Sequence, residues 1–390
     1  MEGDFIKIRK WLMPFSWLYG LGVKLRNIMF ETGVLKTHSF DVPVISVGNI
    51  TVGGTGKTPH VEYLINLLHD KCKVAVLSRG YKRKSSGFII AGKDATVKTI
   101  GDEPYQMKQK YADIVVAVDK DRCNGIEQLT NDDIIKGIDV VLLDDAFQHR
   151  YVKPGINILL IDYHRLIIYD KLLPAGRLRE PASGKNRADI VIITKCPEDL
   201  KPMDFRVITK AMDLFPYQQL YFTTLAYNNL HPMFCGEERP LDTIKKDETL
   251  LVVTGIASPK QMIIDLKPYS EKIHSMTFGD HHNFTKGDIE RINKEFAALP
   301  QPKMIITTEK DSARLLGMKG MSQEVRHNIY TLPVEIKFIP EQEEKFNENI
   351  IGYVRKNSRD SILAKAKDDN KTNNSDNTGN RTGTISFRNN

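Results

Sequence analysis

The chain has 390 residues, of which 41% are hydrophobic and 27% are charged. This composition is typical of a globular protein of two to three domains and excludes a disordered, collagenous or polytopic membrane chain. The net charge is +7, but three of the surplus positive charges lie in residues 1–37 and two in residues 357–390. The nearly balanced body excludes a broad nucleic-acid-binding face. The four cysteines form no C-x-x-C pair, which excludes a zinc framework or a disulfide scaffold and suits a reducing cytosol.

The N-terminal segment, residues 1–37, contains a short apolar run, Trp11–Val23, with basic residues on both sides. The run has about thirteen residues, whereas roughly twenty are needed to span a bilayer. Both tryptophans of the chain lie here, and such side chains settle at the depth of lipid headgroups. We predict a monotopic amphipathic helix on an anionic membrane surface; the alternative is a helix packed on the protein's own core.

The body alternates short apolar runs with polar, helix-like stretches, which predicts an α/β fold with a mostly parallel sheet. The expected strands are Val42–Val47, Val74–Leu77, Ile114–Val118, Val140–Leu143, Ile156–Ile161 and Ile190–Ile193. This alternation of apolar and polar stretches weakens after residue 215. It resumes with a strand at Leu250–Thr254, helices near Pro259–Leu266 and Lys286–Ala298, and a strand at Met304–Thr307. We therefore predict five segments: a membrane-associating segment (1–37), a first domain (38–215), a linker (216–245), a smaller α/β domain (246–356) and a disordered tail (357–390).

A phosphate-binding loop lies in the stretch VPVISVGNITVGGTGKTP, residues 42–59. A predicted strand runs into a glycine-rich turn, and Lys57 and Thr58 open an amphipathic helix, so backbone N–H groups and the helix N-terminus can surround a phosphate. In this motif the lysine reaches the β- and γ-phosphates and the Thr58 hydroxyl ligates Mg²⁺. The first domain is therefore predicted to be of the phosphate-loop NTPase type, with helices on both faces of its sheet. The expected nucleotide-binding residues are Thr51, Val52, Gly53, Gly54, Thr55, Gly56, Lys57 and Thr58, with Thr51 at the position where the usual pattern has its first glycine.

Two carboxylates follow the apolar run of residues 139–145, DVVLLDD. Asp144 and Asp145 would lie at the carboxyl edge of the sheet beside the phosphate loop, where a phosphoryl-transfer site needs metal ligands, so we predict that both bind Mg²⁺. A guanine-specific N-K-x-D or T-K-x-D motif is not met by Thr194-Lys195-Cys196-Pro197, which has proline in place of the aspartate. ATP is therefore the predicted nucleotide.

Taken together, eight motifs in one order make the chain resemble the tetraacyldisaccharide 4′-kinase family of lipid A biosynthesis, over residues from about 10 to about 350. The motifs are VGNITVGGTGKTP (47–59), SRGYKR (78–83), GDEP (101–104), DDAFQHR (144–150), LLPAGRLREP (172–181), GIASP (255–259), FGDHHNF (278–284) and TTEKDSARL (307–315). The family's loop also carries a small hydroxyl residue at the position of Thr51. Two departures are Ala146 and Lys82, where the family more often has glycine.

The resemblance implies an ATP- and Mg²⁺-dependent kinase that phosphorylates the 4′-hydroxyl of a tetraacylated glucosamine disaccharide 1-phosphate, giving lipid IVA and ADP. It implies a two-domain α/β architecture with a cleft between the domains. The expected partners are this glycolipid and an anionic membrane surface, on the cytoplasmic face of the inner membrane of a Gram-negative-type bacterium. No nucleic-acid partner is expected, and a monomer is favoured.

The resemblance also implies roles for individual side chains. It makes Asp102 of GDEP the base that accepts the hydroxyl proton, with Lys57 on the phosphates; the residues alone would favour Asp102 as a helix N-cap. It places His281, rather than His282, across the cleft, where it orients the aspartate. The residues expected to bind the anionic glycolipid are Arg79, Arg83, Gln148, His149, Arg177 and Arg179. The alternatives are a phosphate-loop ATPase or GTPase acting at the membrane and a non-enzymatic membrane scaffold that binds nucleotide.

Overall fold

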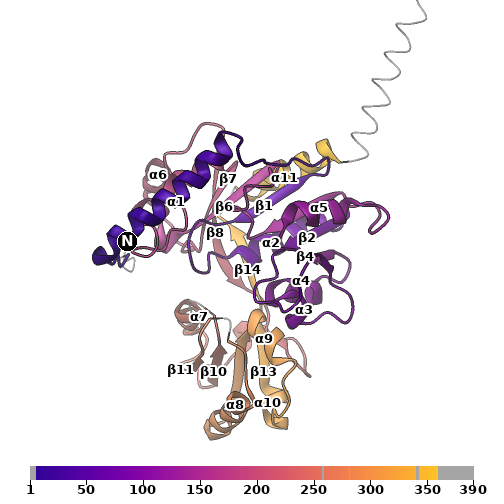
Figure 1. Cartoon of the computed structure of the whole chain (residues 1–390). Coiled ribbons are helices and arrows are strands. Elements are labelled where there is room, and N and C mark those ends of the chain that lie inside the picture. The colour runs from indigo at the N-terminus through magenta and orange to yellow at the C-terminus, as the bar shows by residue number, and fades with distance from the viewer. Residues whose placement is uncertain (1–5, 257–258, 281, 340–341, 359–390) are drawn as a thin grey trace, which may run out of the picture.

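Two β-sheets organise the chain in the computed structural model, which describes residues 6–256, 259–280, 282–339 and 342–358. Figure 1 shows a larger unit around one sheet and a smaller unit around the other, with the helix α1 along the outside of the larger unit. The predicted role of His281 and almost all of the predicted tail concern residues outside the described ranges.

The larger sheet has nine strands, and all but its two edge strands run parallel. Their order across the sheet is β14 (Val334–Phe338), β8 (Gln219–Tyr227), β7 (Ile190–Thr194), β6 (Ile156–Asp162), β1 (Val44–Gly48), β5 (Val140–Asp144), β2 (Val74–Ser78), β4 (Val115–Val118) and β3 (Ile89–Ile90). The predicted α/β fold class is confirmed, and the six strands expected in the first domain are all present.

Helices cover both faces of this sheet, because alternate residues of each strand point to opposite sides. Val140 and Leu142 belong to one core, whereas Val141 and Leu143 belong to the core on the other face. The first face carries α2 (Lys57–Leu68), α4 (Asp102–Lys110) and α11 (Glu343–Asn357), and the second face carries α5 (Arg122–Thr130) and α6 (Pro202–Met212). With both faces buried, the strands are apolar throughout, and this continuous pattern made them recognisable in the sequence.

The smaller sheet has five strands in the order β11 (Lys272–Thr277), β10 (Thr249–Thr254), β12 (Lys303–Thr308), β13 (Ile329–Leu332) and β9 (His231–Pro232). Only β9 is antiparallel to its neighbour. The helices of this unit are α7 (Pro259–Leu266), α8 (Lys286–Ala298), α9 (Glu309–Leu315) and α10 (Gln323–Asn328); the short α3 (Val97–Ile100) precedes α4 in the larger unit.

The chain crosses between the two units more than once, which differs from the segment boundaries expected from the sequence. The expected linker contains β8, a long strand of the larger sheet, and β9 of the smaller one. The last part of the expected second domain, β14 and α11, belongs to the larger unit instead. The strand β14 pairs with β8, and α11 packs on the larger core through Phe346, Ile350 and Val354. These apolar side chains are buried in the larger core, and the sequence pattern does not tell which sheet a strand joins.

The helix α1 (Met13–Glu31) packs on the larger unit by one narrow face. The Ser16 hydroxyl donates to the Leu172 carbonyl at 3.0 Å, and the Tyr19 hydroxyl donates to the Arg179 carbonyl at 2.8 Å. Gly20 permits this close approach, since a Cβ there would lie 2.8 Å from the Leu172 side chain. Within the described ranges, no helix combines the length and apolar character needed to cross a bilayer.

The opposite face of α1 and the turn before it leave apolar side chains in solvent. Trp11 and Trp17 are 74% and 70% exposed. The other exposed large apolar residues of α1 are Phe15, Leu18, Tyr19, Leu21, Leu25 and Ile28. A contiguous patch of this kind on a soluble surface marks a site of interaction with an apolar partner or membrane.

Candidate active site

The loop between β1 and α2 has the backbone geometry expected of a phosphate-binding loop. It turns at Gly53 and Gly56, whose φ angles are +125° and +82°, and it enters α2 at Lys57. Only glycine adopts such left-handed angles without a steric cost. The unpaired N–H groups and the partial positive charge at the start of α2 therefore face the loop, where an anionic phosphate would be stabilised.

The loop is held in shape from inside and from the neighbouring strand. Asn49 Nδ2 donates to Thr55 Oγ1 at 2.8 Å, and Thr194 Oγ1 donates to the Thr55 carbonyl at 3.0 Å. Lys195 Nζ donates to the Gly54 carbonyl. The Thr194-Lys195 pair, which resembles the start of a guanine-binding motif, thus contacts the backbone of the phosphate loop.

The outer edge of the loop pairs with the segment that carries two of the predicted substrate arginines. Thr51 forms a β-bridge with Leu178, and the Val52 N–H donates to the Arg177 carbonyl at 2.8 Å. Val52 is one of the predicted nucleotide-binding residues, but its N–H is hydrogen-bonded to the protein's own backbone. The arrangement fixes the position of the 172–181 motif relative to the loop.

Asp144 lies directly beside the phosphate loop, because β5 and β1 are neighbours and Asp144 is in register with Val47. The side chain is buried, and its Oδ2 accepts a hydrogen bond from Ser78 Oγ at 3.1 Å. Burial raises the pKa of Asp144, and repulsion from Asp145 raises it further. A carboxylate in this position is stabilised by a cation, which points to a metal or to Lys57 as its partner.

Asp145 occupies the turn after β5 with a φ of +49°, a left-handed conformation that is uncommon for a residue with a Cβ. Its Oδ1 lies 3.6 Å from Lys57 Nζ, so the phosphate-loop lysine faces this carboxylate. This ion pair holds the lysine beside the loop, so Asp145 competes with the nucleotide phosphates for it.

The chemistry of these donors fits Mg²⁺. Thr58, at the start of α2, and Asp144 and Asp145, at the end of β5 and in the turn after it, supply the hard oxygen ligands that this ion prefers. The raised pKa of Asp144 also reflects two adjacent carboxylates without enough compensating charge. A divalent cation between them would remove this repulsion.

Asp102 lies at the start of α4, where the smaller unit meets the larger one. Gly101, with a φ of +94°, is the N-cap, and Asp102 is the first residue of the helix, so the N-cap role considered for Asp102 is not observed. The carboxylate is buried and receives a hydrogen bond from Arg314 Nη2 of α9, and Lys310 Nζ lies 3.9 Å away. The neighbouring Glu103 pairs with Lys310 at 2.7 Å, and burial raises the Glu103 pKa to about 7.

The two histidines of the FGDHHNF motif differ in what the structure says of them. His281 lies outside the described residues, so its predicted catalytic role stays a prediction. His282 Nε2 is 2.9 Å from Asp288 Oδ2 at the start of α8, and its ring stacks on Phe278 at 4.7 Å. These contacts give His282 a role inside the smaller unit.

Comparison with known proteins agrees with this geometry. The sequence profile of a family described as tetraacyldisaccharide-1-P 4′-kinase, LpxK, matches residues 8–355. The chain belongs to this family. It is 63% identical to a tetraacyldisaccharide 4′-kinase of Phocaeicola vulgatus over 363 residues, covering 93% of this chain and 99% of the relative. A tetraacyldisaccharide 4′-kinase of Bacteroides fragilis is 53% identical over 379 residues, covering 95% of this chain and all of the relative.

A solved structure supports the same family. A crystal structure of LpxK from Aquifex aeolicus in complex with ATP superposes with a TM-score of 0.68 and 31% sequence identity, covering 89% of this chain and 99% of that chain. The family resemblance predicted from eight motifs is thus confirmed, and so is the fold class. Kinases of this family bind their acceptor as an anionic glycolipid, and this directs attention to the cationic side chains near the phosphate loop.

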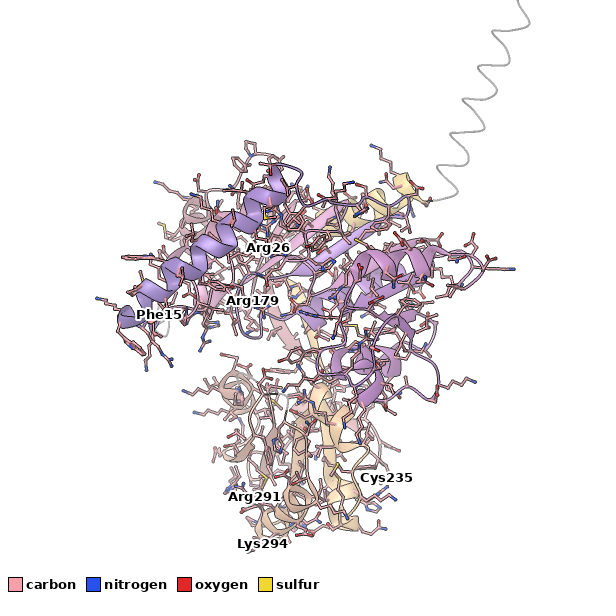
Figure 2. All side chains as sticks on the ribbon, viewed as in Figure 1. Phe15, Arg26, Arg179, Cys235, Arg291 and Lys294 are labelled. Atoms are coloured by element: carbon pink, nitrogen blue, oxygen red, sulfur yellow. The ribbon has the colours of Figure 1, made fainter. Side chains whose placement is uncertain are left out.

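Two of the predicted substrate residues, Arg179 and Gln148, are in contact between the phosphate loop and α1 in this tetraacyldisaccharide 4′-kinase family member. Arg179 Nη1 donates to Gln148 Oε1 at 3.3 Å and lies 4.0 Å from Asp145. Figure 2 shows Arg179 close to Arg26 of α1, whose guanidinium donates to the Gln148 carbonyl at 3.0 Å. Arg177 is exposed on the same segment. This cluster places positive charge beside the exposed apolar face of α1.

The two remaining arginines predicted to bind substrate, Arg79 and Arg83, differ in their surroundings. Arg79 follows β2 and is exposed. Arg83 donates to the carbonyls of Val118 at 3.3 Å and Gly87 at 2.7 Å, so its guanidinium stabilises the loop of the SRGYKR motif. That loop touches the GDEP motif, since a Cβ on Gly101 would lie 3.1 Å from the Tyr81 carbonyl.

His149 lies deeper in the same region and remains neutral near physiological pH. Burial and the nearby Arg122 guanidinium lower its pKa to about 4. Among the described residues, one ligand atom each of Asp121, Cys123 and His149 lie within 4.8 Å of one another. This mixed oxygen, sulfur and nitrogen set would suit zinc better than Mg²⁺, but Asp121 already caps α5 by accepting the N–H of Cys123 at 2.9 Å.

The sequence analysis did not identify Arg122, which is almost fully buried next to Asp144 and Asp145. Its guanidinium donates to the carbonyl of Asp119 at 3.0 Å and to the carbonyl of Asp144 at 3.3 Å. Burial lowers its pKa to about 10, although Asp144 and Asp145 favour the charged form. No motif pattern surrounds Arg122, so only the packing of α5 on the sheet could reveal it.

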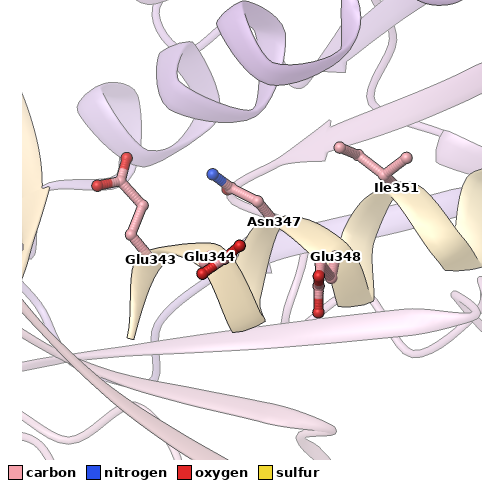
Figure 3. A pocket seen from close by; sticks show the side chains of 5 residues that line it. All are labelled: Glu343, Glu344, Asn347, Glu348 and Ile351. Carbon is pink, nitrogen blue, oxygen red and sulfur yellow. The ribbon is translucent and has the colours of Figure 1, made fainter. Parts of the chain in front are cut away.

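One surface hollow lies away from this site. Figure 3 shows its lining on α11, which consists of Glu343, Glu344, Asn347, Glu348 and Ile351, and its volume is about 530 Å³. Three glutamates would repel both a nucleotide and a phosphorylated glycolipid. The hollow therefore has no part in the site described above.

Proposed function

We propose that this chain is an ATP-dependent kinase that transfers the γ-phosphoryl group of ATP to the 4′-hydroxyl of a tetraacylated glucosamine disaccharide 1-phosphate. The products are ADP and lipid IVA. The observation that carries the proposal is a phosphate loop with two aspartates beside it, in a member of a family of 4′-kinases whose chain also holds a buried aspartate where the two units are in contact.

The chain's own residues divide the work of the reaction. The loop N–H groups and Lys57 bind and neutralise the phosphates, and Thr58, Asp144 and Asp145 would hold Mg²⁺, which supplies further charge neutralisation when bound. Lys57 must leave Asp145 to reach the nucleotide. The 4′-oxygen then forms its bond to the γ-phosphorus while the bond from that phosphorus to the β,γ-bridging oxygen breaks, and ADP leaves with the electron pair.

Asp102 accepts the proton that the 4′-hydroxyl loses in this step. A sugar hydroxyl is a weak acid, so a positioned carboxylate is needed as the new bond forms. The predicted assistance of His281 belongs to the same proposal, as does glycolipid binding by Arg79, Arg83, Gln148, His149, Arg177 and Arg179. The exposed position of Arg177 and the pairing of Arg179 with Gln148 support the idea that these side chains can turn toward a phosphate.

The helix α1 extends this proposal to the membrane. Its exposed apolar face, which carries Trp17, would lie in one leaflet at the cytoplasmic face of the inner membrane, together with Trp11 in the turn before the helix and with basic residues nearby. The glycolipid would then reach the active site without leaving the bilayer surface entirely.

The test is to incubate the purified full chain with γ-labelled ATP, Mg²⁺ and the disaccharide lipid in detergent. Transfer of label to the lipid, lost in Lys57→Ala and Asp102→Asn, is the expected result. Label that appears only as free phosphate would favour the alternative ATPase activity, and no turnover would favour a nucleotide-binding scaffold. Full lipid kinase activity of Asp102→Asn would refute the role of Asp102 as base.

A further inference from the structure

The buried carboxylate of Asp102 is held by cations that come from the other unit. Asp102 begins α4 in the larger unit, and α9 of the smaller unit packs against α4. Arg314 Nη2 donates to Asp102 Oδ2, and Lys310 Nζ lies 3.9 Å from the same oxygen. The other carboxylate oxygen accepts the Glu103 N–H at 3.2 Å. Each oxygen of Asp102 thus has a defined partner.

Arg314 is itself fixed by a buried framework in the smaller unit. Its Nη1 donates to Asp311 Oδ1 at 3.0 Å and to the Gly255 carbonyl at 3.4 Å, and its side chain is only 5% exposed. Asp311 is fully buried, and its Oδ2 accepts from Thr254 Oγ1 at 3.1 Å and from the Gly255 N–H at 2.9 Å. A planar guanidinium held at one nitrogen aims the other nitrogen in a set direction.

The far end of α4 is attached to both units as well. Lys110, the last residue of α4, pairs with Glu62 of α2 at 2.6 Å and with Glu309 of α9 at 2.9 Å. Because α2 begins at Lys57, this contact links α4 to the helix that carries the phosphate loop. The place of Asp102 relative to the nucleotide therefore depends on α9 at both ends of α4.

We propose that Arg314 is a positioning residue for the phosphoryl-transfer reaction, which aims the Asp102 carboxylate from the smaller unit. The inference rests on the proposed function, in which Asp102 accepts the hydroxyl proton. A buried carboxylate without a partner is costly and would turn toward other donors, and Arg314 prevents this by compensating its charge in one orientation. The docking of the smaller unit on α4 thereby completes the catalytic site.

The experiment measures lipid kinase kcat, both KM values and direct ATP binding for Arg314→Ala, Arg314→Lys and the wild type, with unfolding followed by circular dichroism. Arg291→Ala serves as the control, because Arg291 is an exposed arginine at the far end of the smaller unit (Figure 2). Displacement of a reacting group by about 1 Å costs about a hundredfold in rate. We expect kcat of Arg314→Ala to fall by about that factor, with an ATP dissociation constant within about twofold of wild type.

Two further measurements separate positioning from mere folding. Guanidinium ion in the assay should restore part of the activity of Arg314→Ala, and Arg314→Lys should lie between Arg314→Ala and the wild type. In an Asp102→Asn background, Arg314→Ala should cause no further loss of kcat, since the residues act as one unit.

Each outcome decides a different claim. Full activity of Asp102→Asn would refute the proposed base, whatever Arg314 does. An inactive Asp102→Asn together with a wild-type kcat for Arg314→Ala would overturn the positioning role alone, and so would a full additional loss in the double variant. If Arg314→Ala does not fold, Arg314→Lys decides by the same kcat and double-variant criteria.

Discussion

A methyl group added at Gly48 should displace Asp144 and Asp145, the proposed metal ligands, without touching them. Gly48 ends β1 immediately before the phosphate loop, and a Cβ built on it would lie 2.7 Å from the Phe147 backbone nitrogen and 2.8 Å from the Phe147 Cβ. Phe147 follows Asp144 and Asp145 in the turn after β5, and its side chain is buried. The strand and the turn cannot both stay in place in Gly48→Ala.

The size of the effect follows from these distances. Ordinary van der Waals contact begins near 3.4 Å, so the turn must move by about 0.7 Å relative to the loop. Overpacking of this kind costs about 1–3 kcal/mol of stability. A misplacement of nearly 1 Å at a catalytic group costs up to about a hundredfold in rate, so we expect kcat/KM for ATP to fall between about ten- and a hundredfold.

The assay compares ATP-dependent lipid phosphorylation and thermal unfolding of Gly48→Ala with those of Gly352→Ala. Gly352 lies on α11, and no described atom comes within 4 Å of a Cβ built there. Gly352→Ala should keep wild-type activity and gain about 0.5–1 kcal/mol, because alanine favours a helix over glycine. Wild-type activity and stability of Gly48→Ala would refute the packing argument.

Three further substitutions, at Asp145, Leu21 and Glu62, test an ion pair, an exposed apolar face and a buried carboxylate. Asp145→Asn frees the phosphate-loop lysine but removes a metal ligand, so ATP binding without Mg²⁺ should tighten while Mg²⁺-dependent turnover falls, as measured by ATP titration and kinase assay. Leu21→Glu, on the exposed face of α1, should reduce sedimentation with anionic vesicles. Burial, followed by a neighbouring carboxylate, raises the Glu62 pKa from 4.5 to about 7. The folded state then binds more protons between these pH values, so stability falls as the pH rises through them, and Glu62→Gln should flatten this fall in urea unfolding.

Each of these three predictions can be contradicted by a defined result, and two of them have a matched control variant. For Asp145→Asn, equal ATP affinity with and without the substitution in the absence of Mg²⁺ would contradict the ion pair's competition with phosphate. Ile134→Glu, at another exposed apolar residue, should leave vesicle binding unchanged; equal loss in both variants would remove α1 from the explanation. Glu348→Gln alters an exposed carboxylate on α11. If it flattens the pH dependence as much as Glu62→Gln does, the assignment to Glu62 is wrong.

Local patterns were enough to find six of the nine strands of the larger sheet and the phosphate loop. Strands buried on both faces are apolar throughout, and the helix predicted near Lys286–Ala298 has those bounds in the structure. The strand β11 escaped prediction because it lies at the edge of the smaller sheet and most of its residues are exposed, which leaves it without an apolar run. The sequence also did not predict that β14 and α11 belong to the larger unit, since the apolar pattern of a strand does not indicate which sheet it joins.

The residues of the candidate site also fall into two groups, those that the sequence identified and those that only the structure revealed. The loop residues and Asp144 could be named from the sequence because they are close together along the chain or follow strands that end at one edge. Arg122 and Arg314 could not, although Arg314 lies in a motif that carried the family resemblance. The contact between Arg314 and Asp102 joins residues more than 200 positions apart, and no spacing rule predicts such a contact.

The sequence alone showed that the net charge of +7 lies mostly at the two ends of the chain and that the body between them is nearly balanced. The sequence by itself determined the fold class, the phosphate loop, the family and the apolar run at the N-terminus, because each depends on residues close together along the chain. Only the tertiary structure decided that Trp17 of α1 and Trp11 in the turn before it face solvent, that Lys57 faces Asp145, and that the smaller unit supplies the cations around Asp102. These features arise from packing between distant segments, where burial and charge compensation select the partners.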